Sequence, residues 1–248
     1  IEEEGERFLS GLGDEAGYVG LGRDYVLLDD AASSGMGRLM ALGRGLPYLP
    51  QIFLRHRWQK VPIDRFLPDE FWLQGSAILQ AEALTALHPR LFPVRQMNFA
   101  CGPDSIRTLL EEEIFRRGEK PLLQLVTDGQ TNNAPFATRI EAQERVISLY
   151  RRSKTPRLES LFPVREPPRP DRTWIVPYMG DISRLGAALL RHIGQPALCP
   201  PTATAASLAW ADRVVTAENC LPLRGVVGDV LAFVDEARRR GEEPPDRF

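Results

Sequence analysis

The three cysteines are the residues of this sequence best suited to carry chemistry. Cys101 stands in the stretch "NFACGPDSI", where an apolar run of strand length ends and a helix is predicted to begin near Pro103. A thiolate at such a junction faces unpaired backbone N–H groups and the positive end of a helix dipole, and both lower its pKa. It can then bind a metal or a cluster, or act as a nucleophile. A small residue packed in a turn is the alternative interpretation.

Cys220 has a matching context, because in "ENCLPLRGVVGD" it precedes Leu-Pro and the start of a predicted long helix. The carboxyl ends of parallel strands meet at one edge of a sheet, so Cys101 and Cys220 could converge there. Cys199, in "PALCPPT", ends a short apolar stretch, and this context predicts a buried structural thiol. Three widely separated cysteines do not form a disulfide framework.

Other candidate residues give weaker signals. The stretch "GLGRD" contains half a phosphate loop, but it completes neither G-x-G-x-x-G nor G-x-x-x-x-G-K-S/T. Isolated histidines, for which solvated or capping roles are expected, are His56, His88 and His192. Aspartates that fit a functional carboxylate and a helix or turn cap about equally are Asp128, Asp181 and Asp229.

The elements that must position these residues follow from the alternation of strand-length apolar runs with helical periodicity, which predicts βαβ units and a parallel sheet. Strands are predicted in the first half at Ala16–Gly22, Leu46–Pro50, Leu91–Phe99 and Pro121–Asp128. Helices are predicted at Gly35–Leu42, at Phe71–His88, from a cap at Asp104 or Ser105 to Gly118, and at Phe136–Arg152. The prolines of the second strand favour an edge position or a loop.

Residues 153–172 contain five prolines and several charges, which predict a linker or surface excursion between a first lobe at 1–152 and a second at 173–248. The second lobe contains predicted strands at Thr173–Asp181 and Pro196–Thr202 and predicted helices at Ile182–Gly194, Thr202–Val215 and Cys220–Gly241. The expected fold is therefore α/β, with two Rossmann-like parallel-sheet lobes flanked by helices and a second lobe that is incomplete.

The composition is that of an ordinary globular protein. The 248 residues are 43% hydrophobic and 26% charged, and their formal net charge is −2, so no overall field favours nucleic acid or an anionic membrane. We find neither an apolar run of the roughly 20 residues that a membrane span needs nor a signal peptide, which predicts a cytoplasmic protein. The first residue, Ile1, and the charged final stretch suggest an excerpt from a longer polypeptide.

Longer motifs resemble a known family. The segments "CGPDSIRTLLEEEI", "KPLLQLVTD" and "TRIEAQERV" are similar to the C-G-P-D-S, K-P-x-L-x-L-x-x-D and T-R-x-E-A series of proteins related to 2-hydroxyacyl-CoA dehydratases and their activases. The upstream "GLGRDY" and "GRGLPYLP" and the downstream "PYMGD" and "ENCLP" look like further motifs of that family. The resemblance extends in order from about Tyr18 to Val234.

The resemblance implies an oxygen-sensitive iron–sulfur protein, in which cysteines from neighbouring Rossmann-like lobes hold a [4Fe-4S] or double-cubane cluster. Carried over by position, Cys101 and Cys220 become the cluster ligands, whereas Cys199 matches no family cysteine. The implied partners are an ATP-dependent activase module, in the same polypeptide or a separate subunit, and an acyl-CoA substrate. No nucleic acid or membrane is implied, and the oligomeric state stays open.

The chain departs from the family at the loop after Asp128, where "DGQTNNAPF" replaces E-H-T-A-D-A-G. Two cysteines do not complete a four-thiolate site, so further ligands must come from outside this chain. We therefore predict a cluster-binding, dehydratase-like segment of a larger activase-related protein that accepts low-potential electrons. Whether it belongs to a 2-hydroxyacyl-CoA dehydratase lyase stays open. The alternatives are a non-catalytic scaffold or interaction module that has lost its cluster, and a thiol enzyme that uses Cys101 as nucleophile.

Overall fold

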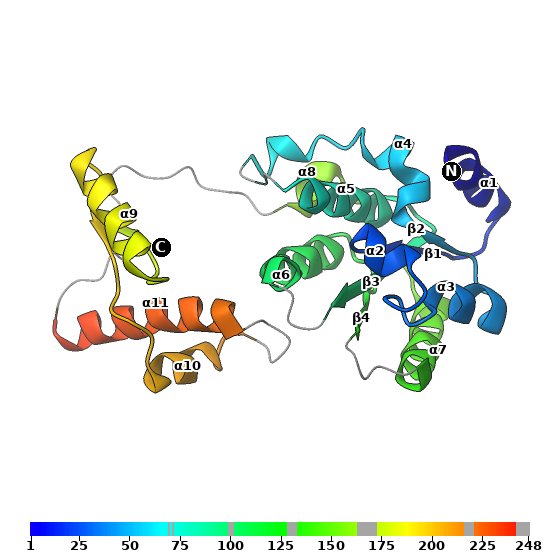
Figure 1. Cartoon of the computed structure of the whole chain (residues 1–248). Helices are drawn as coiled ribbons and strands as arrows, with labels where there is room; N and C mark the ends of the chain where they lie inside the picture. Colours follow the sequence, from blue (N-terminus) through cyan, green and yellow to red (C-terminus); the bar gives the residue numbers. More distant parts are fainter. Residues whose placement is uncertain are drawn as a thin grey trace. The chain divides into compact units, whose positions relative to one another are not determined.

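The structure is a computed structural model that describes residues 1–68, 70, 72–98, 102–127, 133–162, 173–215 and 221–241 (Figure 1). The contacts within the chain divide it into two compact units, Ile1–Arg165 and Glu166–Phe248. Cys101, Cys220 and Asp128 lie outside the described residues.

The first unit is built on a four-stranded parallel sheet with the order β2-β1-β3-β4. Its strands are β1 (Gly17–Leu21), β2 (Tyr48–Pro50), β3 (Leu91–Asn98) and β4 (Leu123–Thr127). The order confirms the predicted parallel α/β sheet and is compatible with a Rossmann-like fold. The proline-containing β2 lies at an edge, where the missing N–H of Pro50 is tolerated, and the central β1 is buried along its whole length.

Helices cover both faces of this sheet (Figure 1). The helical segments of the first unit are α1 (Glu2–Gly11), α2 (Asp24–Leu28), α3 (Met36–Arg38), the π-helical turn η1 (Leu39–Gly43), the 3₁₀ turns η2 (Gln51–Leu54) and η3 (Ile63–Arg65), α4 (Arg55–Trp58), α5 (Leu73–Leu87), α6 (Gly102–Arg117), α7 (Asn133–Leu149) and α8 (Leu158–Leu161). The four helices predicted from periodicity are present, with boundaries shifted by a few residues. The structure adds α1, α2 and α4, in stretches for which no helix was predicted.

Two hydrophobic cores follow from the alternation of side chains along the strands. On one face, Val19 and Leu21 of β1 pack with Leu91 of β3 against residues of α5, α6 and α8. On the other face, Tyr18 and Val94 pack against residues of α3, η1 and α7. The first unit therefore has three layers, with the sheet in the middle.

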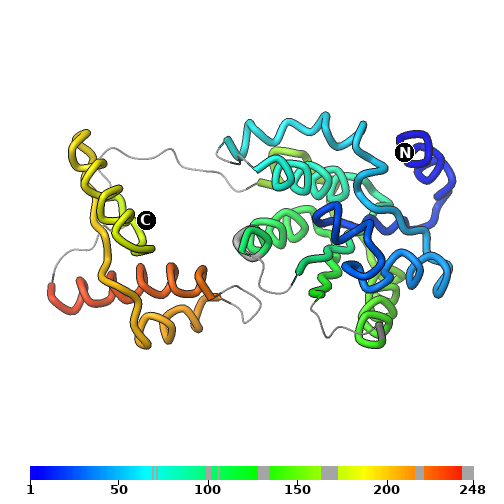
Figure 2. The backbone as a smooth tube through the Cα atoms, viewed as in Figure 1, coloured from blue at the N-terminus to red at the C-terminus, as the bar shows by residue number. Residues whose placement is uncertain are grey.

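Residues 153–162 differ from the prediction, which had placed them in a linker. Leu158–Leu161 forms α8 beside α5 and α6, as the backbone trace also shows (Figure 2). Leu161 and Phe162 are buried in the first core, and the ring of Phe162 stacks on that of Phe66 with a centroid distance of 4.8 Å. The prolines and charges around this short apolar segment concealed its contribution to the core.

The second unit contains a two-stranded parallel sheet and three helices. Its elements are β5 (Trp174–Ile175), α9 (Asp181–His192), β6 (Ala197–Leu198), α10 (Ala205–Ala211) and α11 (Leu221–Arg239). All were predicted in this order. Helices α10 and α11 pack so closely that a Cβ on Gly228 would overlap the carbonyl group of Ser207. No helix in the described part of either unit is long and apolar enough to cross a membrane.

Candidate functional site at the carboxyl edge of the sheet

The strand order places the crossover point of the sheet between β1 and β3, because the chain moves from β1 to one side and from β3 to the other. Open α/β sheets bind ligands at the carboxyl ends of the strands beside this point. Here β3 ends at Asn98 and α6 begins at Gly102. These bounds confirm that the cysteine motif falls between a strand end and a helix start, although Cys101 itself lies outside the described residues.

The residue after β1, Gly22, is packed tightly against β3. Its φ is +154°, and a Cβ there would overlap the carbonyl oxygen of Gln96. Its backbone N–H donates to Oε1 of Gln51 at 3.2 Å. Because this N–H has a protein acceptor, the "GLGRD" stretch does not present it to a phosphate.

A row of polar side chains joins the ends of three elements at the carboxyl edge. The amide of Asn98, the last residue of β3, donates to the hydroxyl of Tyr25 in α2 at 2.8 Å. The hydroxyl of Thr127, the last residue of β4, donates to Oδ1 of Asn98 at 3.0 Å. The sequence analysis did not predict these residues as part of a site. A polar residue at the end of each of two apolar strands would have indicated one.

Behind this row lies a group of buried ionisable side chains, which we call the carboxyl-edge cluster. Its members are Glu82 of α5, Arg95 of β3, and Asp104, Arg107 and Glu111 of α6. Arg95 is 1% exposed and binds the carboxylate of Glu111 with both Nε, at 2.8 Å, and Nη2, at 3.0 Å. Buried bidentate pairs of this kind hold two elements in one fixed arrangement, here β3 and α6.

Glu82 is the unusual member of the cluster. It is fully buried, its oxygens have no hydrogen-bond partner among the described residues, and Nε of Arg95 is 3.6 Å away. Burial, together with the nearby carboxylate of Glu111, raises the pKa of Glu82 well above its usual range. With Glu82 neutral, two guanidinium groups in the cluster face two carboxylates, and the buried charges balance.

The cluster fixes the first turns of α6 against the rest of the unit. Oδ1 of Asp104 lies 3.5 Å from Nη2 of Arg107 and 3.2 Å from Nε of Arg23, which follows β1. The sequence suggested that Asp104 caps this helix. The structure places it within the first turn instead, with its side chain buried among arginines, because α6 already begins at Gly102.

At the amino ends of the same strands, the buried Lys120 and the half-buried Arg152 face main-chain oxygens. Nζ of Lys120 donates to the carbonyl groups of Pro89, at 3.0 Å, and Leu91, at 2.7 Å, and lies 4.2 Å from the centre of the Phe92 ring. Burial, with a smaller contribution from Arg152, lowers the pKa of Lys120 to about 7. The lysine of the "KP" motif thus lies at the edge opposite the candidate site.

Of the three histidines, His56 and His88 have local partners, and His192 is exposed at the end of α9. His56 contacts the carboxylate of Glu6, and Nδ1 of His88 accepts the N–H of Arg90 at 3.3 Å. Burial, followed by the charges of Lys120 and Arg90, lowers the pKa of His88 to about 4.

Asp181 lies in the first turn of its helix and does not cap it, and Cys199 is less buried than predicted. Asp181 begins α9 and pairs with Arg184 at 3.3 Å, as expected of a residue at a helix start. Cys199 follows β6, is half-buried rather than fully buried, and its Sγ donates to the carbonyl group of Pro200 at 3.6 Å.

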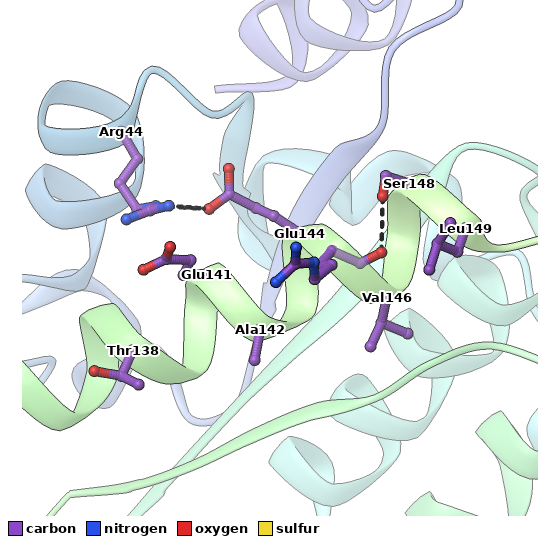
Figure 3. Close-up of a pocket in the computed structure, with 9 residues that line it drawn as sticks. Arg44, Thr138, Glu141, Ala142, Glu144, Val146, Ser148 and Leu149 are labelled. Atoms are coloured by element: carbon purple, nitrogen blue, oxygen red, sulfur yellow. Dashed lines mark hydrogen bonds and ion pairs between the residues drawn. The ribbon is translucent and has the colours of Figure 1, made fainter.

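A surface depression of about 810 Å³ lies on the outer side of α7, away from the candidate site (Figure 3). Arg44, which precedes β2, pairs with Glu144 across it with Nε 2.7 Å from Oε2. Val146 and Leu149 contribute exposed apolar surface. Because Arg44 lies before the amino end of a strand, this depression is not part of the carboxyl edge.

Among the described residues, no three or more His, Cys, Asp or Glu side chains are grouped so that they could hold a metal ion. The two predicted ligands, Cys101 and Cys220, lie outside the described part. Comparisons of the chain with protein-family models, with curated proteins and with solved structures gave no match. The dehydratase resemblance therefore depends on the sequence motifs alone.

Proposed function

We propose that this chain is an iron–sulfur cluster-binding, dehydratase-like segment of an activase-related protein, with Cys101 and Cys220 as cluster ligands. The observation that carries the proposal is the position of α6. This helix of 16 residues begins at Gly102, directly after the cysteine, at the crossover point of a parallel sheet. Its amino end is held by the buried pairs of the carboxyl-edge cluster.

The surroundings of Gly102 suit a bulky anionic group. Among the described residues, apart from its chain neighbours and its own helix, no heavy atom lies within 4 Å of the position that a Cβ on Gly102 would take. Within the part of the chain that the structure describes, the first turn of α6 therefore has space beside Gly102. Unpaired N–H groups and the helix dipole at this end stabilise a negative charge, which thiolate-bound clusters carry.

Cys220 has an equivalent place in the sequence of the second unit, since it directly precedes Leu221, the first residue of α11. In the proposed arrangement, two Rossmann-like lobes joined by a proline-rich segment each provide one thiolate from a loop before a helix. Two thiolates leave coordination positions to ligands from outside this chain. A bound cluster supplies one-electron transfer, and an ATP-dependent activase would be the electron donor for reductive chemistry such as 2-hydroxyacyl-CoA dehydration.

The test is anaerobic purification of the full-length polypeptide and its reconstitution with iron and sulfide. We expect stoichiometric iron and sulfide and a visible charge-transfer band, and we expect Cys101→Ser and Cys220→Ser each to lose most of both. Cys199→Ser is the matched control and retains them, because Cys199 is engaged locally with Pro200. Iron-free protein purified without oxygen would contradict the proposal and favour the scaffold that has lost its cluster. Equal loss in all three variants would contradict Cys101 and Cys220 as specific ligands.

A further inference from the structure

The second unit contains a pocket of about 540 Å³ between α10 and α11, which we call the α10–α11 pocket. The two helices lie side by side (Figure 1). Hydroxyl, apolar and charged side chains all line the pocket. Every residue of its lining belongs to the second unit, so the pocket does not depend on the candidate site of the first unit.

Asp229 is the residue of this pocket that indicates a ligand, because its carboxylate is buried and unpaired within the described part of the chain. It lies in the interior of α11, is 5% exposed, and its Oδ1 is enclosed without a hydrogen-bond partner among the described residues. A helix cap does not explain a carboxylate in the middle of a helix of 19 residues. A buried carboxylate without a partner is costly, so a folded protein retains one mainly where a partner binds.

The neighbouring carboxylates of the lining are paired already. Oδ2 of Asp235 lies 2.6 Å from Nη2 of Arg239, and Oε1 of Glu236 lies 3.7 Å from Nε of Arg240. These pairs balance their own charges and leave the negative charge of Asp229 as the one to be matched. A metal ion is a poor match, because hard cations require several oxygen ligands and the other two carboxylates are held by arginines.

The apolar part of the pocket indicates the body of the ligand. The rings of Trp210 and Phe233, both half-buried, line it together with Ala206 and Ala232. The guanidinium carbon of Arg213 lies 4.1 Å from the centre of the Trp210 ring and fixes the orientation of this ring. An aromatic or aliphatic group can pack here while a cationic end reaches Asp229.

We propose that the α10–α11 pocket binds a small organic amine, with its protonated ammonium group at Asp229 and its apolar body against Trp210 and Phe233. The ammonium group donates up to three hydrogen bonds, and its charge compensates the carboxylate that the fold leaves unpaired. This inference is independent of the proposed iron–sulfur function.

The experiment titrates phenethylamine, as its hydrochloride, into the full chain by isothermal calorimetry near neutral pH. Phenethyl alcohol, which has the same body without the charge, is the matched ligand control. We expect saturable binding of the amine at millimolar or lower concentration and at least tenfold weaker binding of the alcohol. Because this comparison uses the unaltered chain, it does not depend on whether a variant folds. Absence of amine binding, or equal binding of the alcohol, would overturn the proposal.

The variant arm compares Asp229→Asn with Asp235→Asn, which removes a carboxylate of the same helix that is already paired with Arg239. We expect the first to weaken amine binding by about tenfold or more, the value of a charge-assisted hydrogen bond, and the second to change it less than about twofold. We also expect Asp229→Asn to raise the melting temperature of the free protein, because it removes an uncompensated buried charge. Unchanged amine affinity in Asp229→Asn would overturn the assignment.

Discussion

The two edges of the four-stranded sheet both bury ionisable side chains, but they compensate them differently. At the carboxyl edge, the side chains of the carboxyl-edge cluster neutralise one another, as Arg95 does with Glu111. At the amino edge, Lys120 faces carbonyl groups of the main chain and has no carboxylate within ion-pair distance among the described residues. One edge depends on charge pairing between three elements, and the other on backbone dipoles that the fold itself supplies.

The two groups therefore have different roles: the carboxyl-edge cluster positions the start of α6, and the cations at the amino edge stabilise the fold. The carboxyl-edge cluster connects β3, α5 and α6 and holds the helix start that follows the cysteine motif. Lys120 and Arg152 instead bind main-chain carbonyl groups near the start of β3 and the ends of α5 and α6. Arg152 donates to the carbonyl groups of Leu87 and Gly118. Variants of the two groups should therefore differ in the size of their effects and in their response to pH.

The largest effect is expected from Arg95→Met, which breaks the carboxyl-edge cluster. It leaves the carboxylate of Glu111 buried and without its bidentate partner, and such a loss costs about 3–5 kcal/mol of the free energy of unfolding. Urea denaturation measures it. The control is Arg116→Met, which removes an exposed pair with Glu113 and should cost at most about 1 kcal/mol. Equal effects of the two variants would contradict the role assigned to the cluster.

A smaller effect is expected from Lys120→Met at the amino edge. The change preserves most of the side-chain volume but leaves two carbonyl groups, those of Pro89 and Leu91, without a donor. We expect a loss of about 1–3 kcal/mol in the same denaturation experiment. Lys60→Met, at an exposed position, serves as the control and should lie within about 0.5 kcal/mol of the unaltered protein. If Lys120→Met lost as much of the free energy of unfolding as Arg95→Met, the proposed difference between the two edges of the sheet would be wrong.

The strands and long helices of both units could be predicted because their periodicity is regular, whereas the partners of buried charges could not. Arg95 in "LFPVRQMNF" and Glu82 in "ILQAEALTAL" interrupt apolar segments, and a charge in such a place implies that it is paired. Which residue pairs with it depends on how α5 and α6 pack on β3. That packing is a tertiary property, and no local pattern contains it.

The candidate sites show the same limit. The position of Cys101 between strand and helix followed from local sequence, since β3 ends at Asn98 and α6 begins at Gly102, each within a few residues of the predicted bound. For Asp229 the sequence left a cap and a functional carboxylate as equal alternatives. The structure excludes the cap, because α11 extends from Leu221 to Arg239 and Asp229 lies well inside it. Only the packing of α10 on α11 reveals that its Oδ1 has no partner among the described residues.

The pH dependence of stability offers a finer test of the amino edge. The pKa of Lys120 is about 7 in the folded protein and 10.5 when unperturbed, so the unfolded chain binds more protons between these values. Stability from this group therefore rises with pH across that range, by at most about 1.4 kcal/mol per pH unit. We expect unfolding at about pH 7.5 and about pH 9 to show this rise in the unaltered protein and not in Lys120→Met. An equal rise in both would assign it to other groups.

The smallest loss of stability is expected from Glu82→Gln, and it decides whether the carboxyl-edge cluster is balanced. Burial raises the pKa of Glu82, so its stabilising contribution is complete below the unperturbed value of 4.5 and is lost as the pH rises through the raised pKa. A neutral Glu82 is nearly isosteric with glutamine, so the substitution should cost less than about 1 kcal/mol of the free energy of unfolding near pH 4 and should raise that free energy near pH 7, because glutamine folds without taking up a proton. An ionised Glu82 would instead pair with Arg95, and its loss would cost about as much as that of other buried pairs. Measuring Glu82→Gln beside Arg95→Met therefore separates two charge states of the same cluster. A large loss in both variants would mean that three carboxylates, not two, face the buried guanidinium groups.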